Sequence, residues 1–265
     1  MTDIHPTAAQ EAFLAREQHH KRQVMVLRIL LLVLLASLWE LSAFLGILDD
    51  FIFSSPSRII TCLWKMTLDK SIFLHTGITI FETFLSFFLV IVIGLSMAIL
   101  LWSSRSISEI LEPYLVILNS LPKSALAPIL IVWLGNNMKT IVVAAVSVAV
   151  FGSILTLYHG FSQMDPDKIK LIYALGGTKK DVLTKVMIPG SIPLIISNMK
   201  VNIGLCLVGV IIGEFLSANA GLGYLIIYGS QVFQMDMVVT SIVILCIMSA
   251  LLYQAIALLE RKMIR

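Results

Sequence analysis

The chain has 265 residues, of which 58% are hydrophobic and 13% are charged, and its mean hydropathy is +0.95. This composition excludes an ordinary soluble domain, in which about a quarter of the residues are charged. Repeated apolar runs of about 20 residues would produce it, so the sequence predicts an all-α, polytopic membrane protein. A net charge of +3 does not favour nucleic acid as a partner.

The polar N-terminal tail, residues 1–23, leads into a first apolar run at about residues 24–48. This run is too long for a signal peptide and has no small-residue cleavage site, so we expect a retained span. A loop then continues to about residue 76. Within it, the apolar residues of 59–66 have nearly helical spacing and predict a short helix at the membrane interface. A second span is expected at about 79–103.

The third expected span, at about 112–134, contains Pro113, Pro122 and Pro128, with Lys123 near its middle. Prolines this close together cannot all lie in an uninterrupted helix, so we expect this span to be broken and kinked. Three more spans are expected at about 140–160, 194–215 and 238–259. Residues 24–265 are therefore expected to form one transmembrane domain with six membrane-spanning helices.

The loop at residues 161–193 is the longest polar interruption in the C-terminal half, and it begins with signals for a short helix. Asp165 and Pro166 fit the N-cap and the first helical position. Apolar residues then follow at i, i+3 and i+4 and predict one apolar stripe: Ile169, Ile172 and Tyr173.

A second short helix is predicted after a glycine elbow in the same loop. Gly176–Gly177 ends the first helix with residues that tolerate left-handed backbone. Thr178 and Asp181 have the spacing of a cap that opens another helix. Pro189 and Pro193 are expected to close it.

The distribution of basic residues predicts the orientation in the membrane. With the N-terminus inside, the inner segments hold 13 of the 19 lysine and arginine residues, and the outer loops hold four. Because positively charged loops stay inside, both termini and the 161–193 loop are expected in the cytoplasm.

Lys123 is a candidate for the lining of a solute pathway, since an ionisable residue at membrane depth usually faces a cavity. A proline kink also frees carbonyls that could line such a path. The candidate pathway residues in this segment are Asn119, Ser120, Lys123 and Ser124. The alternative is that Lys123 extends to the interface or binds neighbouring carbonyls as a structural clamp.

Glu214 is a second candidate pathway residue, near the outer end of the fifth span. The alternative is a structural carboxylate that orders a tight external turn, which Gly221 and Gly223 would allow. Lys200, in the same span, is expected to extend to the interface or to pair near the 161–193 loop.

No catalytic or metal-binding pattern is present in the sequence. The chain has no G-x-S-x-G, H-E-x-x-H or P-loop motif. Its three cysteines have no paired spacing, so neither a disulfide framework nor a metal site is expected. We therefore do not expect an enzyme.

From Pro56 to Ala250 the chain resembles the membrane subunits of bacterial ABC importers, in particular the nitrate/sulfonate/taurine permease family. The matching segments are SSPSRI at 54–59, LPKSALAPILIVWLG at 121–135, and GEFLSANAGLGYLI at 213–226. Gly176 and Pro189 have the spacing of the family's EAA loop. The chain departs from that pattern at 170–172, where Lys-Leu-Ile replaces Glu-Ala-Ala.

The resemblance implies the type I ABC importer permease architecture in a bacterial inner membrane. In such proteins the EAA loop is a coupling helix that lies in a groove of a cytosolic ATPase subunit. Carried over to this sequence, the coupling residues are Lys170, Tyr173, Ala174, Leu175, Gly176, Gly177 and Thr178. Tyr173 would be an aromatic anchor, and the surrounding lysines would affect orientation and encounter rate.

The resemblance also implies the partners. They are two ATPase subunits that bind ATP and Mg²⁺, a second permease copy, and an external solute-binding protein. The chain itself would hold no cofactor. The solute implied is a small anion such as nitrate, a sulfonate or taurine, with an aromatic or pyrimidine-like solute as the alternative.

Two alternatives stay open on the residues alone, one for the function of the chain and one for the role of the 161–193 loop. A secondary transporter would need buried acidic relays, but the acidic residues of the spans lie mostly near the span ends. An amphipathic helix lying on lipid headgroups would explain the lysines and the apolar stripe of the 161–193 loop. It would not explain two capped helices joined by a glycine elbow.

Overall fold

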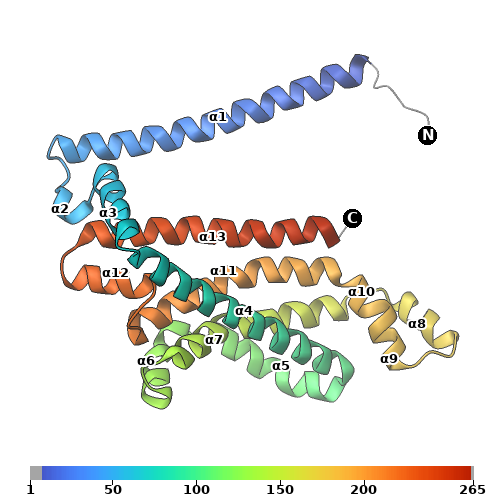
Figure 1. Cartoon of the computed structure of the whole chain (residues 1–265). Coiled ribbons are helices and arrows are strands. Elements are labelled where there is room, and N and C mark those ends of the chain that lie inside the picture. Colours follow the sequence, from blue (N-terminus) through green and yellow to red (C-terminus); the bar gives the residue numbers. More distant parts are fainter. Residues whose placement is uncertain (1–7, 264–265) are drawn as a thin grey trace.

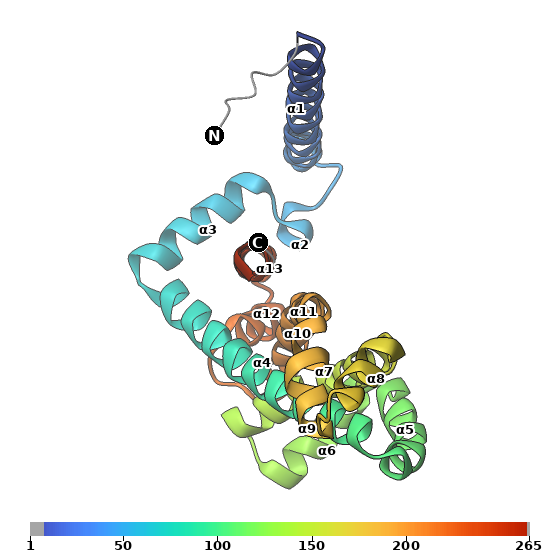
Figure 2. The ribbon, with the colours of Figure 1, turned by 90° about the vertical axis from the view of Figure 1, so that its right-hand side faces the viewer.

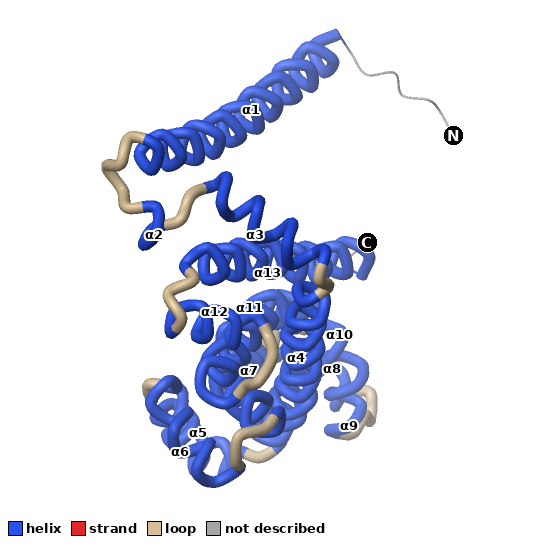
Figure 3. Tube along the Cα trace, turned by 60° about the vertical axis from the view of Figure 1, so that its left-hand side comes forward, coloured by secondary structure: helices blue, strands red, loops and turns tan. Residues whose placement is uncertain are grey.

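The computed structural model describes residues 8–263, and their side chains from residue 16 to 261 except residue 50. The described part is helical, with no strand (Figure 3). Five helices are long and apolar enough to cross a membrane, and a sixth span results if a pair bent by 96° is taken as one. The prediction of an all-α polytopic membrane protein is therefore confirmed.

The first three helices precede the main bundle (Figure 1). They are α1 (Ala8–Phe44), α2 (Asp50–Phe53) and α3 (Pro56–Leu68). α1 has no break near residue 23, because the polar tail continues the helix of the apolar run. It stands apart from the bundle in two views and packs mainly on α3 (Figures 1 and 2). No residue in the most apolar stretch of α1 is buried.

The central bundle is built around α7 (Met138–Ser162), which packs most extensively on α4 (Ser71–Ser103) and α11 (Ile192–Ser217). The backbones of α7 and α11 come very close. A Cβ on Gly209 would lie 2.5 Å from the Cα of Ala145. Small residues allow such close approach and are enriched at helix–helix contacts in membranes. The loop was predicted to continue to about residue 76, but α4 already starts at residue 71, so the loop is shorter than predicted.

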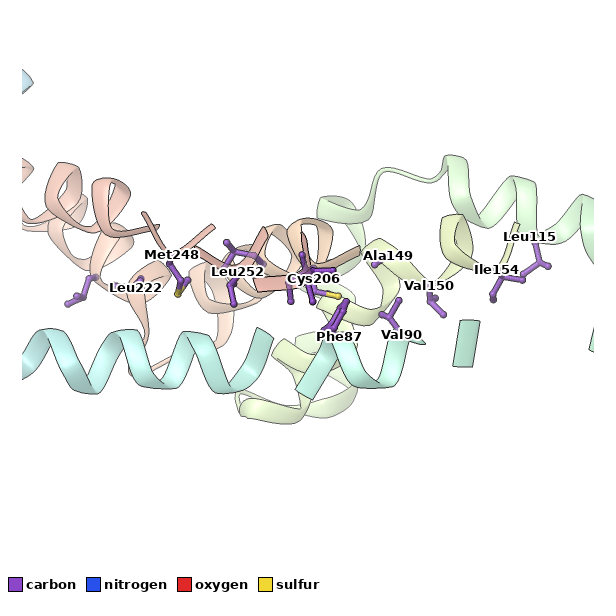
Figure 4. Close-up of a cluster of buried hydrophobic side chains, with 14 of the residues drawn as sticks. Phe87, Val90, Leu115, Ala149, Val150, Ile154, Cys206, Leu222, Met248 and Leu252 are labelled. Carbon is purple, nitrogen blue, oxygen red and sulfur yellow. The ribbon is translucent and has the colours of Figure 1, made fainter. Parts of the chain in front are cut away.

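The main apolar core lies along this bundle and continues to α13 (Met235–Met263). Figure 4 shows Phe87 and Val90 of α4 beside Cys206 of α11, with Ala149 of α7 and Leu252 of α13 nearby. Val90, Ala149 and Cys206 are fully buried. A short helix, α12 (Leu222–Gln231), connects α11 to α13 and also packs on both.

The third span is broken once, not at each proline. It consists of α5 (Arg105–Ser120) and α6 (Lys123–Leu134), with Pro113 and Pro128 inside the helices. The break falls at Leu121–Pro122, where ψ is 140° and 102°. The residue before a proline is disfavoured in the α region, and here proline itself takes extended backbone as well. The expectation that the other two prolines break the helix was wrong.

The 161–193 loop forms α8 (Pro166–Ala174), α9 (Lys179–Val182), a π-helical turn (Leu183–Met187) and α10 (Ile188–Gly190). The expectation that Pro189 and Pro193 close the second helix was wrong. Each lies in the first turn of a helix, where the missing N–H of proline has little cost. The chain therefore stays helical from α9 almost to α11. α1 begins and α13 ends at the α8–α9 end of the molecule (Figure 1).

Candidate functional site

Local hydrogen bonds fix the elbow between α8 and α9, as the sequence predicted. Asp165 caps α8 by accepting from the Asp167 backbone N–H at 2.9 Å. At the other end, the Gly177 N–H donates to the Ile172 carbonyl at 2.9 Å and the Gly176 N–H to the Tyr173 carbonyl at 3.0 Å. This is the Schellman arrangement, and Gly176 takes the left-handed φ of +78° that it needs.

The start of α9 is fixed by a reciprocal capping box. The Asp181 carboxylate accepts from the Thr178 N–H at 2.9 Å, and the Thr178 hydroxyl accepts from the Asp181 N–H at 3.4 Å. Hydrogen bonds from Lys185 and Thr178 hold the pKa of Asp181 below its usual range. Because its pKa is lowered in the folded protein, the ionised Asp181 contributes to the stability of the fold at neutral pH, and this contribution is lost only in acid.

α8 turns part of its apolar surface inward and part of it to solvent. Ile169 and Ile172 pack against a cluster whose fully or almost fully buried members are Ala98, Leu157, Phe161, Val182 and Met187. Tyr173 is 47% exposed, Leu171 57% and Leu175 76%. The predicted stripe is therefore divided, because Ile169 and Ile172 are partly buried whereas Tyr173 is exposed. The exposed Leu171 was not singled out from the sequence.

The remaining coupling candidates lie on the same exposed elbow. Ala174, Gly176 and Thr178 are exposed, and Gly177 is partly covered by Ile172. Lys170 pairs with Asp167 at 3.0 Å, and both side chains are more than 70% exposed. Such a pair contributes little to stability. Lys170 is therefore available to a partner.

The pathway candidates of the third span lie at its break. The Lys123 Nζ donates to the carbonyls of Leu118, at 3.0 Å, and of Asn119. These carbonyls have no helical partner because α5 ends there. The Ser120 hydroxyl donates to the Val116 carbonyl, and the side chains of Ser120 and Ser124 are exposed. Lys123 thus has the geometry of the clamp that the sequence left as an alternative.

We predict that Lys123→Ala lowers transport more than Lys200→Ala does. The first change leaves the Leu118 and Asn119 carbonyls at the break without the donor that replaces their missing helical partners. Lys200 instead forms an ion pair with Glu260 near the end of α13. Uptake by the two variants, at equal amounts in the membrane, measures the difference. Equal and negligible losses would contradict a role for the Lys123 clamp in transport.

Glu214 lies far along the chain from these residues and is buried at the corner between α11 and α12. Its carboxylate accepts from the Thr79 hydroxyl at 2.7 Å and from the Gly223 N–H at 2.6 Å. The Leu222 N–H donates to Thr79 at 2.9 Å. The described contacts of Glu214 tie α4 to the α11–α12 turn, and none joins it to α5 or α6. This geometry agrees with the structural alternative.

The Glu214 corner contains two residues that the sequence did not assign to it. The His75 Nδ1 accepts from the Gly221 N–H at 3.0 Å. Glu82, which is 3% exposed, lies with its carboxyl group against that of Glu214. Thr79 and Glu82 are three residues apart, so they share one face of an otherwise apolar helix. This polar face is the sequence feature that could have predicted the corner.

A second buried polar cluster lies deeper in the bundle and was also missed. The side-chain amides of Asn198 and Asn202 both donate to the Ser153 hydroxyl, at 2.7 and 3.0 Å. Asn198 and Asn202 are four residues apart, so they share one face of α11. The cluster ties α11 to α7.

Together these features define a class of protein. Several apolar spans, one of them broken, carry polar side chains within the membrane and a rigid, partly apolar helical elbow outside it. The described residues contain no group of three or more His, Cys, Asp or Glu that could hold a metal. These are the parts of a multi-pass membrane transport subunit.

Comparison with known proteins gives the family. Residues 90–265 match the model of the binding-protein-dependent transport system inner membrane component. The chain belongs to this family, whose members are inner-membrane permeases of ABC importers. The sequence expectation of an ABC importer permease of the sulfonate, taurine and nitrate type is thereby confirmed.

Three relatives are named transport permeases. A probable ABC transporter permease protein of Haemophilus influenzae is 30% identical, over 91% of this chain and 98% of its own. A putative aliphatic sulfonates transport permease of Bacillus subtilis is 24% identical, over 89% and 86%. A formylaminopyrimidine transport permease of Halalkalibacterium halodurans is 28% identical, over 74% and 77%.

The fold agrees with solved transporters. A chain of the inward-facing MetNI methionine ABC transporter superposes with a TM-score of 0.62 at 21% identity. The match covers 71% of this chain and 94% of that one. The type I importer permease architecture expected from the resemblance is thereby confirmed.

Proposed function

We propose that the chain is the membrane subunit of an ATP-driven importer and that the α8–α9 elbow docks on a cytosolic ATPase subunit. The observation that carries this proposal is the exposure of Leu171, Tyr173 and Leu175 on an element that is otherwise anchored to the bundle. Large apolar side chains on a rigid, polar-rimmed protrusion have the composition of an interface core. ATP and Mg²⁺ would be bound by the partner, and the chain would hold no cofactor of its own.

The docking proposal includes an orientation. Both termini and the elbow would face the cytoplasm, since the inner segments carry most of the lysine and arginine residues. The arrangement of the described helix ends at the α8–α9 end of the molecule supports a common side. The alternative of a helix lying on lipid headgroups is disfavoured, because such a helix needs no fixed elbow.

The complex would contain two copies of this chain. Polar Asn119, Ser120 and Ser124 stand on an open flank of the molecule, so a single chain provides only one wall of a path. A symmetry-related copy would supply the other wall, and two-fold symmetry is the commonest form of assembly. Each copy would dock one ATPase subunit. α1, which packs little on its own bundle, would remain available to the partner copy.

The solute proposed is a small anion such as a sulfonate, taurine or nitrate, delivered by an external binding protein. The name of the Bacillus subtilis relative supports this class. An aromatic or pyrimidine-like solute is the alternative, which the name of the formylaminopyrimidine relative favours. Stimulation of the reconstituted ATPase by binding protein loaded with each candidate distinguishes the two classes.

Removal of the apolar contacts is expected to weaken docking strongly. Truncation of an aromatic or large apolar anchor at an interface centre costs about 2 kcal/mol or more, which is roughly 30-fold in affinity. We therefore predict that Tyr173→Ala and Leu175→Ala each lower the amount of ATPase that co-purifies with the permease. Val132→Ala, at an 82% exposed position of α6, is the matched control. Unchanged co-purification of both variants would contradict docking at the elbow.

A further inference from the structure

Lys179, the first residue of α9, binds the junction between α4 and α5. Its Nζ donates to the backbone carbonyl of Ser103, the last residue of α4. The same Nζ lies 5.4 Å from the centre of the Trp102 ring, within the distance of a cation–π contact. A cation is also favoured at the C-terminal end of a helix. Three attractions therefore act on one ammonium group.

The base from which Lys179 extends is fixed. Thr178, immediately before it, forms the capping box with Asp181. Further along, Val182 and Met187 are fully buried in the cluster that includes Ala98 of α4. α9 and the π-helical turn thus move together with the ends of the bundle helices. On α8, in contrast, Leu171 and Tyr173 are exposed.

The acceptor side of the contact leads directly into the broken span. Only Ser104 separates α4 from α5, and its hydroxyl caps α5 by accepting from the Ile107 N–H at 3.4 Å. Its carbonyl accepts from the Ser108 N–H at 3.0 Å. A displacement of Ser103 therefore moves the start of α5. α5 ends at the break that carries Lys123 and the other candidate pathway residues.

We propose that Lys179 is a positioning residue that transmits movement of the α8–α9 elbow to α5 through Ser103 and Trp102. This inference rests on the proposed docking of an ATPase at the elbow. α5 would have two positions relative to the bundle, and the Lys179 contact would favour one of them. Lys180 provides the comparison, since it is adjacent and exposed, and its side chain makes no hydrogen bond or ion pair within the described part of the chain.

The first test examines the contact in the permease without any partner. Lys179→Ala removes the donor to Ser103, so the end of α4 should open more often. We expect hydrogen–deuterium exchange of the segment 101–108 to be about 3- to 10-fold faster than in the wild type. Lys180→Ala should leave it unchanged. Lys179→Arg keeps a donor and a ring contact, so it should restore most of the protection.

The second test examines transmission in the complex with the ATPase. A spin label at Ile110→Cys, an exposed position of α5, reports its mobility once the three native cysteines are replaced by alanine. Trapping with ATP and vanadate should change the spectrum of this label. Lys179→Ala should reduce the change at least about 2-fold, with the co-purifying amount of ATPase unaltered. If Lys179 only stabilised the fold, Lys179→Ala would lower the change in the label's spectrum and the amount of co-purifying ATPase together.

The outcomes separate this inference from the proposed function. Unchanged exchange in Lys179→Ala would overturn the contact. Faster exchange with a normal vanadate response would overturn transmission. Loss of ATPase binding in Lys179→Ala would make Lys179 a docking residue and would also overturn the inference. If the wild-type chain bound no ATPase, the proposed function and transmission would fail together, while the exchange result would still report the Lys179–Ser103 contact.

Discussion

Gly176→Trp is expected to abolish ATP-coupled uptake while the protein still inserts into the membrane. A Cβ at Gly176 would meet nothing within 4 Å, so the indole ring would extend into solvent on the exposed elbow. Left-handed backbone costs an L-residue only about 1–2 kcal/mol, which does not unfold a bundle. The ring would instead hold the elbow away from a docked partner. Uptake, the amount of protein in the membrane and ATPase co-purification are the measurements.

Two further variants distinguish the effect of side-chain bulk on uptake from the effect of backbone strain at the elbow. Gly176→Asn tolerates a φ of +78° and is small, so it should keep most of the uptake. Gly177→Ala adds little bulk, but its Cβ would lie 2.5 Å from the Ile172 Cγ2 and 2.8 Å from the Ile172 carbonyl oxygen. We expect this change to distort the elbow and to lower uptake partly. Normal uptake by Gly176→Trp would contradict docking at Gly176.

The elbow could be predicted from the sequence because its determinants are local. Asp165 and Thr178 cap helices that begin at the next residue, and their partners lie two or three residues away. Apolar runs likewise predict spans, since the membrane imposes their length. The continuation of the helix through Pro189 could not be predicted in this way. Its π-helical turn lies between α9 and α10 and is anchored by Met187, which distant residues of α4 and α7 bury.

The candidate site was predictable only where one segment contains both partners. The Lys123 clamp joins residues four and five positions apart, so the sequence could offer it as an alternative to a pathway role. Glu214 and Thr79 are 135 residues apart, and Lys179 and Ser103 are 76 residues apart. The residue pattern of a single helix cannot reveal a contact between residues this far apart in the sequence. The packing of α4 on α7 and α11 brings them together.

Glu214→Ala is expected to lower the stability of the folded bundle substantially. The change leaves the Gly223 N–H buried without its acceptor, at about 1–3 kcal/mol, while the Thr79 hydroxyl keeps only its hydrogen bond of 3.2 Å to the His75 carbonyl. A loss of about 1–3 kcal/mol corresponds to a fall of roughly 2–12 °C in the thermal midpoint of a chain of this size. Glu214→Gln keeps one carbonyl acceptor, so about half of the loss should be recovered. Thermal unfolding of the purified permease in detergent measures both changes.

The controls decide between the structural and the pathway interpretations of Glu214. Glu109→Ala removes an exposed carboxylate that pairs with Arg105 at 2.8 Å, and it should change stability by no more than about 0.5 kcal/mol. Gly221→Ala should reproduce the Glu214→Ala loss, because its Cβ would lie 2.3 Å from Glu214 Oε1 and its φ is +119°. If Glu214→Ala unfolded at the wild-type temperature but lost uptake, the carboxylate would act on the solute path. Loss of stability in both variants would instead assign Glu214 to the α11–α12 corner.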